Sequence, residues 1–449
     1  MKIIKISSLI LLGGALLFNS SCKKTFYTDA NINHNAPTTM VPSLILPTVE
    51  GSLAYVQGGD LSRFASMFVQ QTYSASRQCG AYYQYILTNQ DVDNCWANMY
   101  TSVMMNDDSL MVPSDNSGYN RYSGVSRILM AYSLMLTTDF WGDVPFSEAF
   151  KGMGNIKPKF DAGSSVYTAI IKLCDDGITK MKDPSAGIFT PGTEDMIYQG
   201  DSTKWIKFAH AIKARIYMHQ SKGSVANANL ALAEIAASFS DNSDNAKYTF
   251  DTKETFANPW YQFNEQRDDI TFTSSTMITN MLTNNDPRVY MMVDTLDPLT
   301  GGDGLNANFG AISSAVEFIS YDELQFMKAE AIITSGGSLT AAQAAYQEGI
   351  MNNMTKLGVS ATDAAAYIAA NGVLTAANAM SKIVNEEYIA LYLNPEAWTL
   401  WRRTGYPVLT PAKGTAIPRR MLYPQTELSY NTANVPAATM YSPKLFWDK

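Results

Sequence analysis

Residues 258–267 hold the side-chain types with which proteins bind polar ligands such as sugars. The segment reads NPWYQFNEQR, so the rings of Trp260 and Tyr261 stand beside the polar groups of Asn264 and Arg267. A ring offers a large apolar face, and amide and guanidinium groups form directed hydrogen bonds. We expect the two rings to stack on a ligand and the two polar side chains to bind its hydroxyl groups. The alternative is that the rings pack in the core.

A second group of aromatic residues precedes this segment in the chain. Residues 81–85 read AYYQY, and a tryptophan, Trp96, follows them. Tyr82, Tyr83 and Trp96 are therefore further candidates for ligand contact, with core packing again as the alternative for each ring.

The residues that catalysis would need are sparse. The chain has three histidines, His34, His210 and His219, and the last two are too far apart for the i, i+4 spacing of a zinc pair. We interpret His219 as a histidine near the end of a helix. The sequence contains no G-x-S-x-G nucleophile elbow and no phosphate loop that ends in a lysine followed by serine or threonine. We therefore predict no metal, no cofactor and no enzymatic activity.

Pairs of adjacent acids are the remaining candidates for acid–base chemistry. Glycosidases use two carboxylates about 5–10 Å apart that face one substrate. Adjacent residues of one helix or loop point in different directions, so we expect such pairs to lie on solvated faces. The pairs are Asp107–Asp108, Asp268–Asp269 and Glu386–Glu387.

The amino terminus has the pattern of a bacterial lipoprotein signal. Lys2 and Lys5 precede an apolar run over residues 6–18, and a short polar stretch with two serines leads to Cys22. A charged region, a short apolar stretch and small residues before a cleavage site mark a secretory signal, and this run is too short to span a bilayer. We expect residues 1–21 to be removed and Cys22 to carry the lipid anchor. The alternative is an ordinary signal with a chance cysteine.

Charge and composition narrow the classes of molecule that the protein could bind. The net charge is −8, and it becomes −10 without Lys2 and Lys5, so we predict no binding to nucleic acid, which requires basic patches. Aromatic residues reach 11% against 16% charged residues, which is compatible with an exported sugar-binding protein. Cys79, Cys95 and Cys174 remain after Cys22, and a Cys79–Cys95 disulfide is left open.

Helical periodicity dominates the rest of the chain. Asp201 is a candidate N-cap for a helix that ends before Gly223, and Ala345 and Gly349 are small residues where a neighbouring helix would approach. Paired helices with short turns form the unit of tetratricopeptide-type arrays, so we predict a scaffold of helical hairpins. Besides the helix after Asp201, the expected helices cover residues 50–72, 122–136, 228–238, 321–334, 340–357 and 377–393.

Long insertions interrupt this scaffold. Residues 241–275 and 294–318 are rich in Asp, Asn, Gly, Ser and Thr and show little helical periodicity. Irregular segments on a rigid scaffold are where binding usually occurs, and the first insertion contains residues 258–267.

Seven segments, taken in order, are similar to one protein family. This ordered set resembles the SusD/RagB-like outer-membrane nutrient-binding lipoproteins of Bacteroidetes type, specifically the divergent second SusD-like branch. The segments are NINHNAPT (31–38), DFWGDVPFSEAF (139–150), YQGDSTKWIKFA (198–209), NDPRV (285–289), YDELQFMKAEA (321–331), EAWTLWRRTGYP (396–407) and IPRRMLYP (417–424). Within them, we expect Trp141 to anchor a turn in the core. We expect Trp398, Trp401, Arg402 and Arg403 to follow a helix, with the arginines holding carboxylates or helix ends.

The resemblance implies a mainly α fold of about four tetratricopeptide-like hairpins that support a long-loop, irregular, ligand-facing half. It implies one domain over residues 22–449, of which 22–48 would be a tether and an extended segment. It also implies a partner, a TonB-dependent SusC-like outer-membrane barrel, to which the lipoprotein would deliver a captured oligosaccharide or peptide. Members of the family are not enzymes.

The resemblance also implies a location at the outer membrane, on the cell-surface face. Lys23 and Lys24 follow the lipidated cysteine where acidic residues would favour surface export, so the periplasmic face stays open. A protein-interaction scaffold is the alternative function, and a glycan-active enzyme is the weakest.

Overall fold

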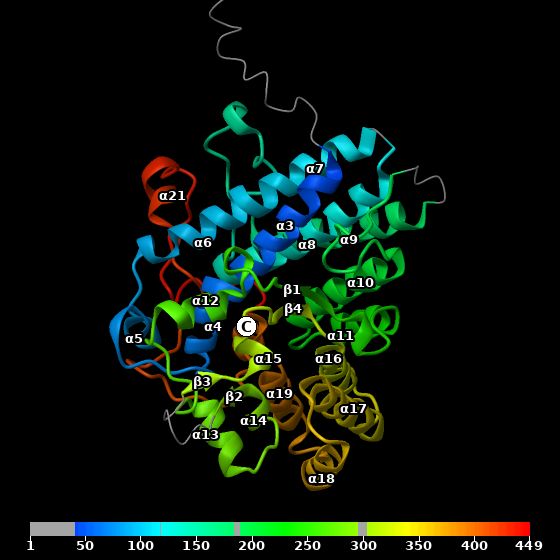
Figure 1. The fold of residues 1–449 in the computed structure, drawn as a ribbon, viewed down its shortest axis with the longest axis vertical. Helices are drawn as coiled ribbons and strands as arrows, with labels where there is room; N and C mark the ends of the chain where they lie inside the picture. Colours follow the sequence, from blue (N-terminus) through cyan, green and yellow to red (C-terminus); the bar gives the residue numbers. More distant parts are fainter. Residues whose placement is uncertain (1–40, 117, 184–188, 295–302) are drawn as a thin grey trace, which may run out of the picture. The chain divides into compact units, whose positions relative to one another are not determined.

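Four helical hairpins make up much of the structure (Figure 1). The computed structural model describes residues 41–116, 118–183, 189–294 and 303–449. The hairpins pair α8 (Asn120–Trp141) with α9 (Gly163–Lys182), α10 (Ser202–His219) with α11 (Val225–Ala236), α16 (Tyr321–Thr334) with α17 (Leu339–Leu357), and α19 (Ala379–Ala390) with α20 (Glu396–Thr404). Successive hairpins also touch, because α9 packs on α10, α11 on α16 and α16 on α19. This arrangement confirms the mainly α, tetratricopeptide-like fold.

Short helices and two small strand pairs complete the described chain. Before the first hairpin lie α3 (Pro42–Val56), the π-helical η2 (Gln57–Leu61), α4 (Ser62–Phe68), α5 (Arg77–Tyr83), η3 (Asn89–Val92), α6 (Asp93–Ala97), the π-helical η4 (Asn98–Met104) and α7 (Met105–Asn116). Between the second and third hairpins lie η6 (Asn242–Asp244), β1 (Ala246–Thr249), η7 (Glu254–Phe256), α12 (Pro259–Gln266), α13 (Thr276–Thr283), α14 (Val289–Met292), β2 (Val293–Asp294), β3 (Gly304–Leu305), α15 (Ala307–Gly310) and β4 (Ala315–Ile319). The others are η5 (Gly152–Gly154), α18 (Ala361–Asn371) and α21 (Gln425–Tyr430).

The two predicted insertions are joined by an antiparallel strand pair. β1 pairs with β4, and the register places Lys247 opposite Glu317. A shift between Ala246 and Lys247 interrupts the ladder, which is the geometry of a bulge. The insertions are therefore less irregular than expected, because α12 and these strands give them regular elements.

Helix starts and close helix contacts follow the predicted chemistry. The carboxylate of Asp201 accepts hydrogen bonds from the backbone N–H groups of Thr203 and Lys204, which confirms it as the N-cap of α10. In the α16–α17 hairpin, a Cβ added at Gly349 would lie 2.8 Å from the ring of Phe326. Ala345 is also buried there, so the prediction of small residues at a helix contact is confirmed.

Trp141 ends α8 in the core. Its side chain is fully buried and its indole Nε1 donates to the carbonyl of Leu422 at 2.8 Å, while Gly142 turns the chain with a φ of 84°. This confirms the expected anchor and turn.

The segment around Trp398 differs from the prediction. Four residues follow α19 as expected, but they lie within a further helix, α20, that was not predicted: Trp398, Trp401, Arg402 and Arg403. The arginines do hold a helix end and a carboxylate, because Arg402 donates to the Asp139 carbonyl at 2.7 Å and Arg403 to Glu330 at 2.8 Å. The short α20 carries few residues on each face, which hides its periodicity in the sequence.

Other expectations fall on the amino-terminal part of the chain. Residues 1–21, the predicted lipid anchor Cys22 and the tether up to residue 40 lie outside the described residues. Residues 42–48, predicted as extended, form the first turns of α3. Among the described helices, none is long and apolar enough to cross a membrane.

The cysteines answer a question that the sequence left open, whereas the acid pairs differ from the sequence interpretation. Cys79, Cys95 and Cys174 are buried free thiols, so the Cys79–Cys95 disulfide is not formed. Each acid pair was expected on a solvated face, but each has at least one buried member, namely Asp107, Asp269 and Glu386. Arg77 reaches Asp269 at 3.1 Å, Arg288 reaches Glu386 at 2.6 Å, and burial raises the pKa of Asp107 well above its ordinary value.

Candidate functional site

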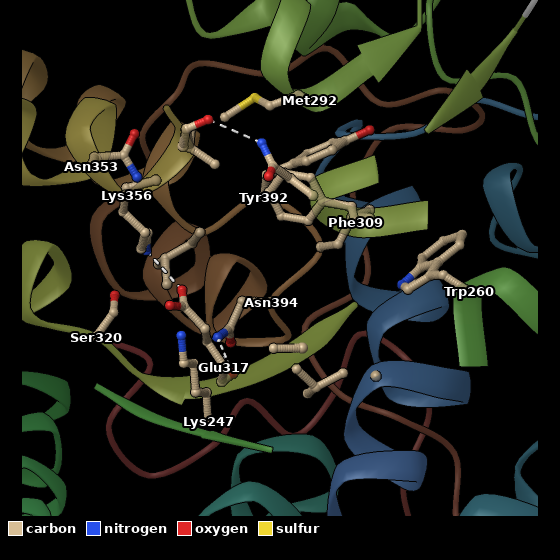
Figure 2. Close-up of a pocket in the computed structure, with 18 of the residues that line it drawn as sticks. Lys247, Trp260, Met292, Phe309, Glu317, Ser320, Asn353, Lys356, Tyr392 and Asn394 are labelled. Atoms are coloured by element: carbon tan, nitrogen blue, oxygen red, sulfur yellow. Dashed lines mark hydrogen bonds and ion pairs between the residues drawn. The ribbon is translucent and has the colours of Figure 1, made fainter. Parts of the chain in front are cut away.

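A cavity of about 210 Å³ lies where β4, η2, α12 and the ends of α17 and α19 meet (Figure 2). Its wall combines rings with charged and amide side chains. Figure 2 shows Lys356 and Glu317 on one side of the cavity and Trp260 on the other. The rings are Trp260, Phe309 and Tyr392, the charged groups are Lys247, Glu317 and Lys356, and the amides include Asn308, Asn353 and Asn394.

The acidic and basic groups of the wall are largely paired with each other. The ammonium of Lys356 lies 2.7 Å from Glu317 Oε2 and 2.9 Å from Asp322 Oδ1. Burial lowers the pKa of Lys356, but these two carboxylates outweigh it and raise the pKa above the ordinary value. Lys356 is therefore charged at neutral pH, and Glu317 is held by it.

Lys247 is the basic residue of the cavity wall that these ion pairs do not include. It faces Glu317 across the β1–β4 ladder, but Glu317 is bound by Lys356, and Lys247 has no ion-pair or hydrogen-bond partner among the described residues. Its side chain is exposed at the cavity. An exposed ammonium with three donors can bind hydroxyl or acidic oxygens of a ligand.

Most of the amide side chains in the wall already donate hydrogen bonds within the protein. Asn394 donates to the Glu317 carbonyl at 3.0 Å, and Asn353 donates to Asp322 at 2.7 Å. Asn308 donates to the Leu357 carbonyl at 3.1 Å, which ties α15 to the end of α17.

Tyr392 supplies a buried polar group without a partner. Its side chain is 3% exposed, its ring meets Phe309 edge to face at 5.1 Å, and its hydroxyl has no hydrogen-bond partner among the described residues. Burial raises the pKa of Tyr392, so the hydroxyl keeps its proton and can donate. An unsatisfied buried hydroxyl costs about 1–3 kcal/mol. Because the hydroxyl oxygen is buried, a ligand acceptor would recover this cost only after a movement of the wall.

The predicted ring Trp260 reaches this cavity but has little free surface. It is 2% exposed, its indole Nε1 donates to Ser62 Oγ at 3.0 Å, and its ring packs edge to face on Phe272 at 5.8 Å. Asn258 fixes the start of α12 by accepting from the Trp260 N–H at 2.8 Å. Trp260 therefore forms part of the wall, and stacking on its face would require movement.

The other predicted residues of the 258–267 segment lie outside the cavity and near the second predicted segment. Tyr261 and Asn264 are partly exposed, and Arg267 reaches Gln78 Oε1 of α5 at 3.4 Å. The guanidinium of Arg267 also lies over the Phe263 ring at 5.8 Å. The two segments that the sequence singled out are thus neighbours in space.

The rings of the second segment are less accessible than expected. Tyr82 is 9% exposed and donates to Asp91 at 2.7 Å, and Tyr83 is partly buried against Tyr73 at 4.9 Å. Trp96 is 4% exposed and its ring is surrounded by those of Tyr100, Trp141, Phe160 and Tyr423. In this structure Trp96 packs in the core.

One group among the described residues has metal-binding geometry, and it lies away from the cavity. Asp139, His219 and Glu396 are all buried within ligand reach of one another. Both ring nitrogens of His219 are engaged, with Glu396 at 2.8 Å and the Tyr167 hydroxyl at 2.7 Å. Burial lowers the pKa of His219, but Glu396 and Asp139 outweigh it and raise the pKa to about 9. A protonated imidazole has no lone pair for a metal, so this group is a buried ion cluster.

Sequence reasoning missed four groups of this cavity, namely Lys247, Phe309, Lys356 and Tyr392. Each lies on a different element, and only the fold brings them together. The β1–β4 register was not visible in the sequence, because each strand is four or five residues long and the two are far apart in the chain.

The sequence of the chain matches one known protein family. A sequence profile of the second SusD-like family, described as starch-binding and associating with the outer membrane, matches residues 34–424. A search of curated protein sequences found no match.

Solved structures show the same fold at low sequence identity. A chitin-binding protein aligns with a TM-score of 0.78 and 23% identity over 91% of this chain and 100% of its own. A SusD/RagB family protein from Bacteroides thetaiotaomicron aligns with a TM-score of 0.77 and 23% identity over 91% and 99%. A chitin-binding SusD homologue from Flavobacterium johnsoniae aligns with a TM-score of 0.74 and 21% identity over 91% and 97%.

Proposed function

The chain belongs to the second SusD-like family, and on this basis we propose that it captures a nutrient at the outer membrane and delivers it to a partner transporter. The profile match over residues 34–424 is the observation that carries the proposal. The transporter is a TonB-dependent barrel of the SusC type. Lipid on Cys22 holds the protein at the membrane, on the cell-surface face.

The proposed ligand is an oligosaccharide. The description of the family as starch-binding and the two chitin-binding relatives support this class. The cavity supports it as well, since rings stand beside a free ammonium and a free hydroxyl. A cavity of about 210 Å³ is below the roughly 300–1,000 Å³ of drug-sized sites. It therefore takes a terminal sugar unit, with the remaining units outside.

Two side chains of the cavity make the proposed polar contacts. Lys247 donates from its exposed ammonium, and Tyr392 donates from its unpaired hydroxyl. Tyr261, Asn264, Arg267 and Tyr83 form a neighbouring surface that binds further units, whereas Tyr82 is buried beneath it.

The ligand is released unchanged in this proposal. Acid–base hydrolysis of a glycoside needs two carboxylates that face the substrate. Glu317 is the one carboxylate in the described lining of the cavity, and Lys356 holds it at 2.7 Å. Product release from an oligosaccharide incubated with the protein would contradict this part of the proposal.

Two substitutions test the site by calorimetric titration with maltohexaose and chitohexaose. Tyr392→Phe removes only the hydroxyl, so the free protein should keep or gain stability while its affinity for the bound sugar falls about tenfold, or about 1.4 kcal/mol. Lys247→Met should also weaken binding. Lys444→Met is the matched control, because Lys444 is an exposed lysine that does not line the cavity. Unchanged affinity in both cavity variants would show that the ligand binds elsewhere.

A protein-interaction scaffold is the second candidate function. It is favoured by the many cavity amides that are already bonded within the protein. Co-purification with the barrel from detergent-solubilised outer membranes, combined with titrations against oligosaccharides and peptides, separates the two. Association with the barrel without binding of any tested ligand would favour the scaffold.

A further inference from the structure

A second and larger hollow lies on the other side of the segment that carries Trp260. Its volume is about 480 Å³, and α3, η4, β1 and η7 form its walls. In Figure 1, α3 and β1 lie next to each other, and α12 lies to the left of β1. Val56 and Ala257 line this hollow, whereas Gln57 and Asn258, the next residues in the chain, line the smaller cavity. The two sites are therefore separated by the chain at these positions.

The hollow is lined by aromatic rings from three elements. Tyr55 of α3 is 46% exposed, and Phe256 of η7 is 62% exposed. Tyr248 and Phe250 lie on one face of the β1 segment with ring centroids 5.0 Å apart. Exposed large rings gathered at a hollow are unusual for a surface that only faces water.

Gly51 lets α3 approach the ring of Tyr248. A Cβ added at Gly51 would lie 3.1 Å from the Tyr248 hydroxyl oxygen, closer than most real contacts of this kind. A larger residue here would push that ring into the hollow, so the glycine helps keep the space open.

The polar groups of the hollow are neutral and partly free. They are the amide of Asn98 and the hydroxyls of Thr48, Ser52, Tyr55, Ser102, Tyr248 and Thr255. The Tyr55 hydroxyl donates to Gln262 Oε1 at 3.2 Å. Ser102 donates to Asn98 Oδ1 at 3.3 Å, which leaves the amide N–H₂ of Asn98 without a partner among the described residues. No charged side chain belongs to the described lining of the hollow.

From this lining we propose that the hollow is a second ligand site, which binds a neutral oligosaccharide. Rings stack on the apolar faces of sugar rings, and hydroxyl and amide groups bond sugar hydroxyls without a formal charge. The volume lies within the range of about 300–1,000 Å³ that is usual for sites that bind a drug-sized ligand, in contrast to the smaller cavity. The absence of a lining cation disfavours acidic glycans. The choice of a carbohydrate rests on the proposed function, whereas the site itself rests on the lining.

The test titrates the full chain by calorimetry with maltohexaose, chitohexaose and, as an acidic probe, a galacturonic acid hexamer. Wild type should bind a neutral hexamer at two sites. The double variant Tyr55→Ala/Phe256→Ala should lose one site or weaken it about tenfold or more, and both residues are exposed, so folding should be kept. Ser52→Trp, which fills the hollow, should have the same effect. Tyr430→Ala, which removes an exposed tyrosine ring outside the hollow, is the control.

The outcomes separate this inference from the proposed function. One-site binding that Tyr392→Phe weakens and the hollow variants leave unchanged overturns the second site and keeps the proposed function. Binding that the hollow variants weaken and Tyr392→Phe does not supports the second site and moves the ligand from the smaller cavity. Equal binding of the acidic hexamer in the hollow overturns the inference of a neutral ligand. No binding of any hexamer overturns both.

Discussion

His219 should make the free energy of unfolding depend on pH. Its ring is 1% exposed in the core between α8, α9, α10 and α20. Nε2 donates to Glu396 at 2.8 Å, Nδ1 donates to the Tyr167 hydroxyl at 2.7 Å, and Asp139 lies 3.5 Å from Nδ1. The protonated ring thus joins two buried carboxylates, and losing its proton would leave both of them underpaired.

The size of the effect follows from the two pKa values of the ring. Burial lowers the pKa of His219, but Glu396 and Asp139 raise it to about 9, against 6.5 for a solvated histidine. One pKa unit corresponds to about 1.4 kcal/mol, so proton binding contributes up to about 3 kcal/mol to folding. Because the folded pKa is raised, this stability is fully present below pH 6.5 and is lost as the pH rises through about 9.

Urea unfolding of the wild type and of His219→Gln at pH 6 to 10 measures this contribution. Glutamine is neutral, so subtracting its free energy of unfolding from that of the wild type removes the other titrating groups. The difference should decrease by about 3 kcal/mol between pH 6 and pH 10, most steeply above pH 7. A difference that does not change with pH would refute a charged His219.

Three further predictions concern the packing of the scaffold. Burial and a neighbouring carboxylate raise the pKa of Glu50, so the free energy of unfolding of the wild type should fall as the pH rises above about 4.5. Glu50→Gln should remove this fall, and urea unfolding at pH 5 and 8 measures it. Gly349→Ala should destabilise the protein by about 1–3 kcal/mol in thermal or urea unfolding, since the new methyl would meet the Phe326 ring, and a stabilised variant would contradict the close packing. Cys79 and Cys95 should resist iodoacetamide in the folded protein and react without reductant once unfolded, because burial raises the pKa of both thiols, whereas a disulfide would stay unreactive.

The sequence was sufficient for the parts of the fold that repeat locally. Asp201 and the apolar spacing after it predicted α10, and Gly349 predicted the contact in the α16–α17 hairpin. Helix α9 was not predicted, although Val166, Ile170 and Cys174 mark its buried face. The i, i+4 spacing of these three residues is the sequence signal of α9.

The candidate site was harder to predict because its parts come together only through distant pairing. Trp260 was predicted to stack on a ligand. In the structure its indole donates a hydrogen bond to Ser62 and its ring packs on Phe272, so it forms part of the cavity wall. A sequence shows which side chains could stack, but not which ones the core has taken. Lys247 was not singled out, because a lone lysine in a loop segment has no distinctive pattern until the register with Glu317 is known.

Equilibrium titration of the purified full chain tests the claim that this SusD-like protein captures an oligosaccharide. We predict saturable binding of at least one neutral oligosaccharide, weakened by Tyr392→Phe or by Tyr55→Ala/Phe256→Ala and unchanged by Lys444→Met. Saturable binding of peptides, with no heat from any oligosaccharide, would contradict the claim.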